Sequence, residues 1–135
     1  MMEDKVTATI ITIGDELLNG RRVNTNLNWL SSQLHKININ TIKGSAIPDT
    51  IEQINDELQG ASNSDYVFVT GGLGSTSDDQ TIEAISHFLK KDTYFDKDYY
   101  KKIKKDFIKK KLTLTKVIEK QAIKINGVKY FDNPV

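Results

Sequence analysis

The segment that decides the fold is DYVFVTGGLGSTSDDQT, residues 65–81. Its residues 66–69 are rich in β-branched and aromatic side chains, which is typical of a buried strand. Gly71, Gly72 and Gly74 then allow a tight turn, and their lack of a Cβ atom lets a ligand approach the backbone closely. Ser77 and Gln80 form a capping pair that predicts the start of a helix.

A glycine turn that leads into a helix is suited to bind an anion such as phosphate, because backbone N–H groups and the positive end of the helix dipole face the ligand. The adjacent acids Asp78 and Asp79 would repel a phosphate unless a divalent cation lay between them, and Mg²⁺ prefers such a combination of carboxylates, phosphate oxygens and waters. The alternative is an ordinary strand–helix turn whose aspartates stabilise the helix dipole. This segment alone leaves both interpretations open.

Length and composition limit the function classes. The chain of 135 residues predicts one domain, 1–135, and its net charge of +1 argues against nucleic acid or a membrane as the partner. The absence of cysteine excludes disulfides and thiolate metal sites, and two histidines are too few for a typical zinc site. No apolar run approaches the ~20 residues of a membrane span and no signal peptide opens the chain, so we expect a cytoplasmic protein.

Apolar residues at strand spacing alternate along the chain with apolar residues at helical spacing. This alternation predicts an α/β fold with a mostly parallel sheet. Strands are expected at 7–13, 37–42, 66–69 and 128–131. Helices are expected after Asn24 or Thr25, after Thr50, around 82–89, after Asp96 or Asp98, and at 116–123.

Acidic side chains follow several of the predicted strands. Asp15 and Glu16 come after the first strand, Asp49 follows the second, and Asp79 lies beyond the third. In parallel sheets ligands bind beyond the carboxyl ends of the strands. We therefore expect these acids to meet the glycine turn at one edge of the sheet.

These residues carry a resemblance to a known family. The segments IGDELLNG (13–20), VNTN (23–26) and TGGLGSTSDDQT (70–81), with Lys120-Gln121-Ala122 and Asn133-Pro134-Val135, resemble the N-terminal domain of the CinA competence/damage-inducible proteins. That domain is part of the molybdopterin-binding superfamily, together with the MoaB and MogA proteins. The order and spacing of the segments agree over nearly the whole chain, and Leu73 with the Asp78–Asp79 pair favours CinA over MogA.

The resemblance implies a three-layer α/β/α sandwich of the molybdopterin-binding type. It also implies an enzyme, a metal-dependent pyrophosphatase for ADP-ribose-type nucleotides, with Mg²⁺ or a similar ion as cofactor and molybdopterin not expected. Catalysis and metal binding are assigned by the resemblance to two acids, Asp79 and Asp49, with Asp78 as a further metal ligand. Binding of the substrate phosphates is assigned to Gly71, Gly72, Gly74, Ser75, Thr76, Asp15, Glu16 and Lys120.

Two departures from the family pattern affect these expectations. Ser75 stands where CinA proteins usually have proline, and the chain stops at Val135, whereas the family pattern continues with a loop, a helix and a strand. We therefore expect a C-terminally truncated domain with an incomplete pocket, and a homo-oligomer, dimer or trimer, that hides the uncovered apolar surface. The alternative functions are a non-catalytic nucleotide- or pterin-binding module and MogA-like adenylyl transfer.

Several other residues have two interpretations. The lysine-rich run 101–111 is either an anion-binding patch or the solvated face of an amphipathic helix, and the near-neutral total charge favours the solvated face. Asn24 and Asn26 are predicted to cap or turn the chain rather than to bind a ligand. Trp29 is predicted to pack against the sheet or at an oligomer contact.

Overall fold

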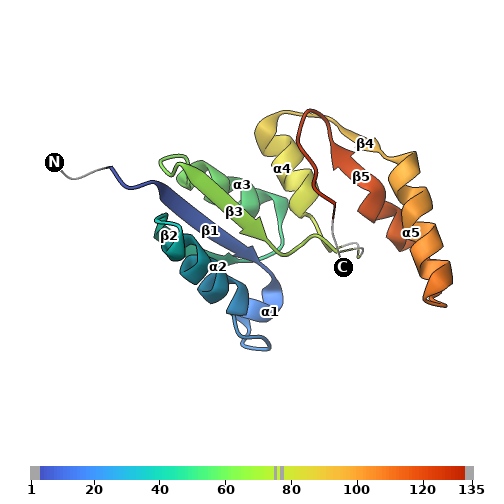
Figure 1. Cartoon of the computed structure of the whole chain (residues 1–135), viewed down its shortest axis with the longest axis horizontal. Helices are drawn as coiled ribbons and strands as arrows, with labels where there is room; N and C mark the ends of the chain where they lie inside the picture. The colour runs from blue at the N-terminus through green and yellow to red at the C-terminus, as the bar shows by residue number, and fades with distance from the viewer. Residues whose placement is uncertain (1–3, 75, 77, 133–135) are drawn as a thin grey trace.

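A computed structural model describes residues 4–74, 76 and 78–132 of the chain. Figure 1 shows a parallel sheet with its helices at one end of the molecule and two short strands with a lysine-rich helix at the other. We call these two parts the sheet lobe and the small lobe. The elements are β1 (Thr7–Ile13), α1 (Asp15–Leu18), α2 (Thr25–Lys36), β2 (Asn40–Ile47), α3 (Ile51–Gly60), β3 (Tyr66–Thr70), α4 (Thr81–Leu89), β4 (Thr93–Phe95), α5 (Lys97–Lys109), the 3₁₀ helix η1 (Lys116–Ala122) and β5 (Ile123–Ile125).

The sheet lobe is built on three parallel strands in the order β2-β1-β3. Strand β1 is paired on both sides, with Ile10 opposite Gly44 on β2 and opposite Phe68 on β3. Six of its seven residues are buried, which explains its almost continuous run of β-branched residues. The mostly parallel sheet is as predicted, but β3 lies at the edge of the described sheet, so the segment 66–69, predicted as a buried strand, leaves Tyr66 and Val67 exposed.

Helices cover both faces of the sheet. Leu34 of α2 packs with Ala8 and Ile10 on one face, and a second core lies on the other face, where α3 and α4 join β1. Alternate residues of β1 serve the two cores because successive side chains of a strand point to opposite faces. The residues of the second core include Ile11, Ile13, Ile54, Leu58 and Ala84. The predicted three-layer α/β/α arrangement is confirmed.

Three helix starts predicted from the sequence are confirmed by their caps. The side chains of Asn24, Thr50 and Asp96 accept backbone hydrogen bonds at the starts of α2, α3 and α5. Helix α4 differs, because the side chain of its N-cap residue Gln80 makes no capping hydrogen bond. The predicted partner Ser77 lies outside the described residues.

Two predicted strands are wrong. The strand expected at 37–42 runs instead from Asn40 to Ile47, because Ile37 closes α2 with its N–H on the Leu34 carbonyl oxygen. The strand expected at 128–131 is not present. The last strand is β5, which pairs antiparallel with β4, a strand that the sequence analysis did not predict.

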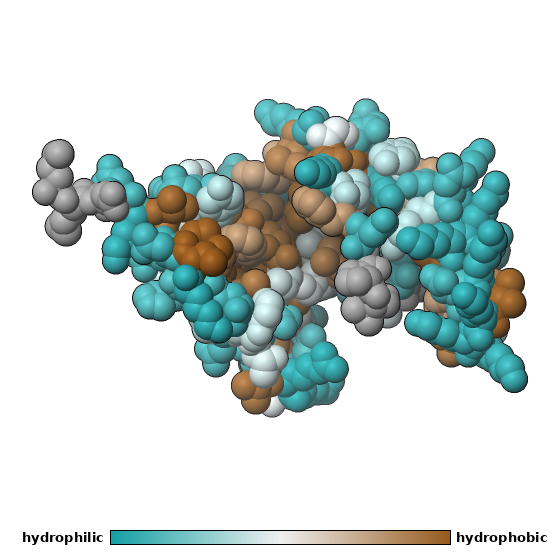
Figure 2. All heavy atoms as spheres, in the orientation of Figure 1, coloured by the Kyte–Doolittle hydropathy of each residue, from teal (hydrophilic) through white to brown (hydrophobic). Residues whose placement is uncertain are grey.

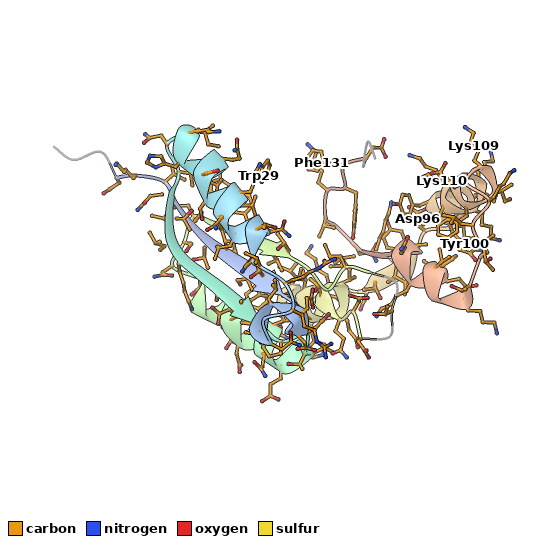
Figure 3. The ribbon with its side chains drawn as sticks, turned by 90° about the horizontal axis from the view of Figure 1, so that it is seen from below. Trp29, Asp96, Tyr100, Lys109, Lys110 and Phe131 are labelled. Atoms are coloured by element: carbon orange, nitrogen blue, oxygen red, sulfur yellow. The ribbon has the colours of Figure 1, made fainter. Side chains whose placement is uncertain are left out.

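The lysine-rich helix α5 presents its charges to solvent and buries Ile103. Lys109 and Lys110 lie at its outer end (Figure 3), and hydrophilic residues dominate this end of the molecule in the space-filling view (Figure 2). The prediction of a solvated amphipathic face is therefore confirmed. Among the described residues, none of the helices combines the length and apolar character needed to cross a bilayer.

Large apolar side chains also remain at the surface. Trp29 is 63% exposed, so it does not pack against the sheet, and Tyr66 and Val67 are exposed on the edge strand β3. Such side chains could be covered by another copy of the chain, although association itself stays a prediction.

Candidate functional site

The carboxyl ends of the three parallel strands meet at one edge of the sheet. Gly14 follows β1, Asp49 follows β2 after Pro48, and Gly71 follows β3. The N–H of Gly14 donates to the carbonyl oxygen of Ile47 at 3.0 Å, which ties the first two ends together. The three turns that we expected to share an edge therefore do so.

The glycine turn packs directly against protein atoms. Gly71 and Gly72 have φ angles of 89° and 62°, a region that glycine tolerates and other residues avoid. Thr81 closes the turn, since its hydroxyl donates to the Gly71 carbonyl oxygen at 2.8 Å and its N–H to that of Gly72 at 3.2 Å. These glycines thus let the chain itself come close, whereas the sequence pattern predicted that they would admit a ligand.

Two carboxylates bracket the turn. A methyl group added to Gly72 would lie 2.8 Å from Oδ2 of Asp49, and one added to Gly74 would lie 2.7 Å from Oδ2 of Asp79. Both contacts are shorter than ordinary van der Waals distances, so the side chains of Asp49 and Asp79 rest on the glycines. The structure therefore brings both predicted catalytic acids to the glycine turn, Asp49 from the segment between β2 and α3 and Asp79 from the segment before α4.

Asp49 lies where a negative charge is disfavoured. Burial raises the pKa of its carboxyl group, and the negative charges of Asp79 and Asp15 raise it further. The N–H of Gln80, which donates to Oδ1 of Asp49 at 3.0 Å, and the charge of Lys120 oppose this effect. Asp49 thus also supplies the acceptor that the Gln80 N–H needs at the start of α4.

Asp79 is held in its ionised form. Its Oδ2 accepts hydrogen bonds from the hydroxyl and the N–H of Thr76, the latter at 3.0 Å. The hydroxyl bond is the largest cause that lowers the pKa of Asp79, and the backbone bonds from Thr76 and Gly74 add to it. The carboxylate therefore holds Thr76 and Gly74 besides standing at the edge of the site, and its neighbour Asp78 is exposed.

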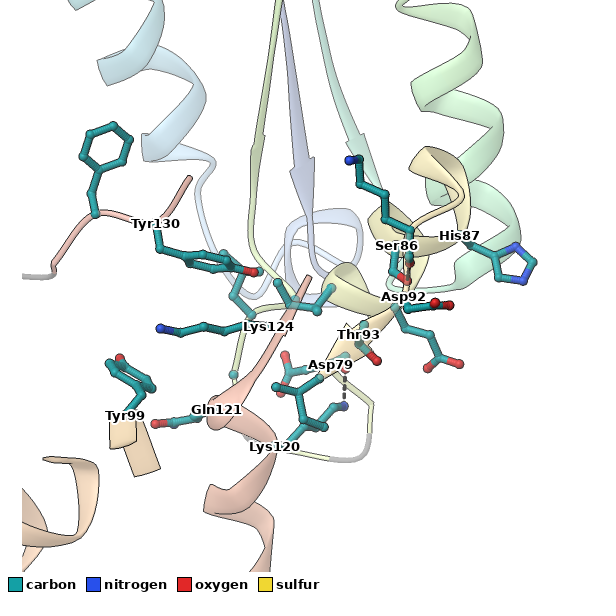
Figure 4. Close-up of a pocket in the computed structure, with 18 of the residues that line it drawn as sticks. Asp79, Ser86, His87, Asp92, Thr93, Tyr99, Lys120, Gln121, Lys124 and Tyr130 are labelled. Carbon is teal, nitrogen blue, oxygen red and sulfur yellow. Dashed lines mark hydrogen bonds between the residues drawn. The ribbon is translucent and has the colours of Figure 1, made fainter. Parts of the chain in front are cut away.

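Lys120 joins the small lobe to this turn. Its Nζ donates to the carbonyl oxygen of Thr76 at 2.8 Å and to that of Asp79 (Figure 4). Lys120 lies on η1, which leads directly into β5. The small lobe therefore supplies a cation to a site built by the sheet edge. The predicted assignment of Lys120 to the site agrees with this position.

Not all predicted site residues reach the same place. Asp15 is close enough for its charge to act on Asp49, but Glu16 folds back over Gly14, where its Oε1 would lie 2.7 Å from an added methyl group. Glu16 lines a separate cavity of about 220 Å³. Asn24 lines it too, and as predicted it is a capping residue, which also donates from Nδ2 to Thr12 at 2.7 Å. Ser75 lies outside the described residues.

The acids suit a metal ion only in part. No group of three or more His, Cys, Asp or Glu side chains is arranged for metal binding in the part of the chain that the structure describes. Mg²⁺, however, is commonly bound by one or two carboxylates together with phosphate oxygens and waters. Asp49 and Asp79 therefore fit an ion that arrives with a phosphate ligand, and they do not fit a cage made of protein groups alone.

A large cleft opens beside the glycine turn. It has a volume of about 1110 Å³ and lies between α4 of the sheet lobe and the small lobe. Figure 4 shows Asp79 and Lys120 at its base and Tyr99, Lys124 and Tyr130 together on one wall. No sequence motif marks these three residues, which meet only through the pairing of β4 with β5.

The sheet order, the glycine turn and the flanking acids together define an α/β domain of the molybdopterin-binding type. A family model described as "Probable molybdopterin binding domain" matches residues 9–131. The crystal structure of the protein CinA from Thermoplasma acidophilum superposes with a TM-score of 0.85 and 32% identity, over 98% of this chain and 78% of that one. MoaB from Pyrococcus furiosus, a tungsten cofactor synthesizing protein, gives a TM-score of 0.57 and 27% identity over 64% of this chain and 54% of that one.

The chain belongs to the CinA-like branch of this molybdopterin-binding domain family. A CinA-like protein of Thermosipho melanesiensis is 37% identical over 127 residues, which are 93% of this chain and 32% of that protein. The chain therefore spans about a third of the length of such curated relatives. A probable FAD synthase of Caenorhabditis elegans is 44% identical over 87 residues, 64% of this chain and 17% of that protein.

Proposed function

We propose that this domain binds the pyrophosphate of a nucleotide at the glycine turn, together with a divalent cation, and hydrolyses ADP-ribose-type substrates. The observation that carries the proposal is the pair of carboxylates, Asp49 and Asp79, that rest on the turn. Without a cation, their charges would repel the phosphates that the positive end of α4, beside the turn, attracts. A divalent ion removes this conflict.

The residues have separate roles in this proposal. Asp49 and Asp79 would hold the ion, which supplies charge neutralisation and polarises a phosphoryl oxygen when it is bound. Lys120 adds a positive charge from the small lobe, and the N-terminus of α4 adds its dipole. In the reaction, the oxygen of a water bonds to one phosphorus and the bond from that phosphorus to the bridging oxygen breaks. The products are two phosphate monoesters, and the two protons of the water pass to these phosphates or to solvent.

A second candidate function is binding of a pterin or nucleotide without turnover. The family model supports it by its description, and MoaB and the probable FAD synthase among the similar proteins have names that point to cofactor synthesis. The small set of metal ligands points the same way. Asp49 and Asp79 lie at the turn and the charge of Asp15 acts on Asp49, but the described residues form no group of three side chains arranged for a metal ion. Binding without hydrolysis would favour this candidate, and adenylyl transfer would produce a nucleotide-linked product.

The test compares Asp79→Asn with the wild type by calorimetric titration of ADP-ribose, with and without Mg²⁺ or Mn²⁺. We expect the metal-dependent part of the binding, and any hydrolysis, to be lost in Asp79→Asn. Asp78→Asn is the matched control and should be milder, because its carboxylate is the exposed neighbour in the same turn. Charge reversal at Lys104 and Lys105 on α5 should leave binding unchanged.

The Asp79→Asn variant also needs a control for the conformation of the turn, because Asp79 accepts a hydrogen bond from the Thr76 N–H. Asn can still accept the Thr76 hydrogen bonds, and circular dichroism will show whether the variant keeps its fold. Equal affinity of the wild type and Asp79→Asn for ADP-ribose, with and without metal, would contradict the proposal.

A further inference from the structure

One wall of the large cleft is not used by the phosphate chemistry. Tyr99, Lys124 and Tyr130 line the cleft together with Asp79 and Lys120, but they come from α5, β5 and the segment after β5. The volume of about 1110 Å³ slightly exceeds the range of ordinary ligand pockets, ~300–1,000 Å³. The cleft is therefore much larger than a pyrophosphate and a metal ion require.

The wall is held in place by Lys124. Its Nζ lies 2.8 Å from Oδ2 of Asp96, 4.5 Å from the centroid of the Tyr99 ring and 4.9 Å from that of Tyr130. The Lys124 side chain is only 17% exposed, and Asp96 in turn caps α5 through the Tyr99 N–H. A cation that contacts two rings and one carboxylate at these distances fixes the rings relative to each other.

Tyr130 is fixed a second time, by its hydroxyl. The N–H of Ile125 on β5 donates to the Tyr130 hydroxyl oxygen at 2.7 Å. The residue nevertheless remains 42% exposed and lines the cleft. An aromatic ring that is oriented by its polar end and still open to a cleft offers a flat, rigid contact surface at little entropic cost.

We propose that Tyr130 is the stacking platform for the base of the bound nucleotide, with Lys124 and Tyr99 as the groups that position its ring. This inference rests on the proposed function, since the base stacks on Tyr130 while the pyrophosphate occupies the glycine turn. Ile82 of α4 and Ile123 of β5 add apolar surface to the same cleft, which suits the base rather than the charged end of the ligand. The small lobe then selects nucleotides over inorganic pyrophosphate.

If Tyr130 had a purely structural role, a different part of its side chain would be essential. In that case the essential group is the hydroxyl that accepts the Ile125 N–H, and the ring face is incidental. Tyr130→Phe removes the hydroxyl and keeps the ring, whereas Tyr130→Leu removes both. The two variants therefore separate the anchoring of β5 from the stacking.

The experiment measures the affinities of wild type and variants for ADP, inorganic pyrophosphate and adenosine by calorimetry in Mg²⁺. We expect Tyr130→Leu to weaken ADP binding by roughly 5- to 150-fold, the effect of removing one base–aromatic stack, and to leave pyrophosphate binding unchanged. Tyr130→Phe should bind ADP much better than Tyr130→Leu does. Tyr94→Leu is the matched control, since Tyr94 is also 42% exposed but does not line the cleft.

Proton NMR gives a second readout, because a stacked base shifts the signals of the Tyr130 ring upfield. If the wild type does not bind pyrophosphate, the proposed function fails. The platform is overturned independently if neither ADP nor adenosine shifts the Tyr130 signals, or if Tyr130→Leu and Tyr94→Leu bind ADP as the wild type does. Equal weakening of ADP and pyrophosphate in Tyr130→Leu would likewise show a general structural effect.

Discussion

Replacing Gly71 by alanine should destabilise the domain far more than the same change at Gly20. Both glycines have φ in the left-handed region, 89° and 78° respectively. An alanine at Gly20 would meet no atom within 4 Å. At Gly71 the added methyl group would lie 2.9 Å from the carbonyl carbon of Ile13 and closer still to its oxygen.

The magnitude follows from these contacts. Left-handed strain alone costs about 1 kcal/mol, so Gly20→Ala should lose about that amount of unfolding free energy. Gly71→Ala must in addition push the end of β1 away, which adds about 1–3 kcal/mol of overpacking. Loss of the adjacent bond between the Gly14 N–H and Ile47 adds about 1 kcal/mol. We therefore expect Gly71→Ala to cost about 3–5 kcal/mol.

Urea denaturation followed by circular dichroism measures both variants against the wild type. The comparison holds the backbone strain constant, so the difference between the two alanines reports the contact with Ile13. A loss in Gly71→Ala no larger than that in Gly20→Ala would refute the argument that β1 and the glycine turn are packed this closely.

Two further predictions concern the acids. Asp49→Asn should be at least as stable as the wild type at pH 7 without ligand, because the raised pKa of Asp49 means that its ionisation opposes folding. The difference should shrink as the pH falls through the folded-state pKa and vanish below the unfolded-state pKa of about 4. Urea denaturation at pH 7 and in acid checks this, and a less stable variant at pH 7 would contradict it. Thr76→Val should cost up to about 1 kcal/mol at pH 7. Asp79 has a lowered pKa, so its contribution is present above the unfolded-state pKa of about 4 and is lost as the pH falls through the folded-state value. The effect of Thr76→Val should therefore shrink in acid, and a loss independent of pH would assign it to packing.

The parts of the fold that could be predicted are those whose causes are local. Asn24, Thr50 and Asp96 bond to N–H groups three residues further along the chain, so their capping roles are visible in a short window of sequence. The buried strand β1 is visible as well, because both of its faces are covered and all seven of its residues are apolar or threonine.

The errors in the fold have physical reasons. The predicted bounds 37–42 were wrong at Ile37. This residue has the β-branched side chain that is typical of strands, but it is the exposed C-cap residue of α2. Strand β2 is largely exposed and contains Lys43 and Gly44, so it shows no clean alternation. The strands β4 and β5 are three residues each and pair across about 30 residues, which no local pattern reveals.

The site was predictable where a motif marks it. The glycine turn, Asp49 and Asp79 follow strands, and the rule that ligand sites lie at the carboxyl edge of a parallel sheet places them together. The cleft wall could not be predicted, because Lys124 meets Tyr99 only after the small lobe folds. The engagement of Asp79 with Thr76 was also not foreseen, since it depends on the conformation of the turn.

The position of Lys120 ties the geometry of the whole molecule to the occupancy of the turn. An ammonium group has three protons, and Lys120 directs donors to two carbonyl oxygens of the turn, those of Thr76 and Asp79. An anion bound at the turn, as proposed, would share the Lys120 ammonium group with these carbonyl oxygens and so change how strongly the bonds hold η1. Thermodynamic linkage then requires the reverse effect: the factor by which a bound anion changes the equilibrium of the lobe contact is the factor by which that contact changes the anion affinity. The orientation of the two lobes would therefore act on the anion affinity as an allosteric effector does.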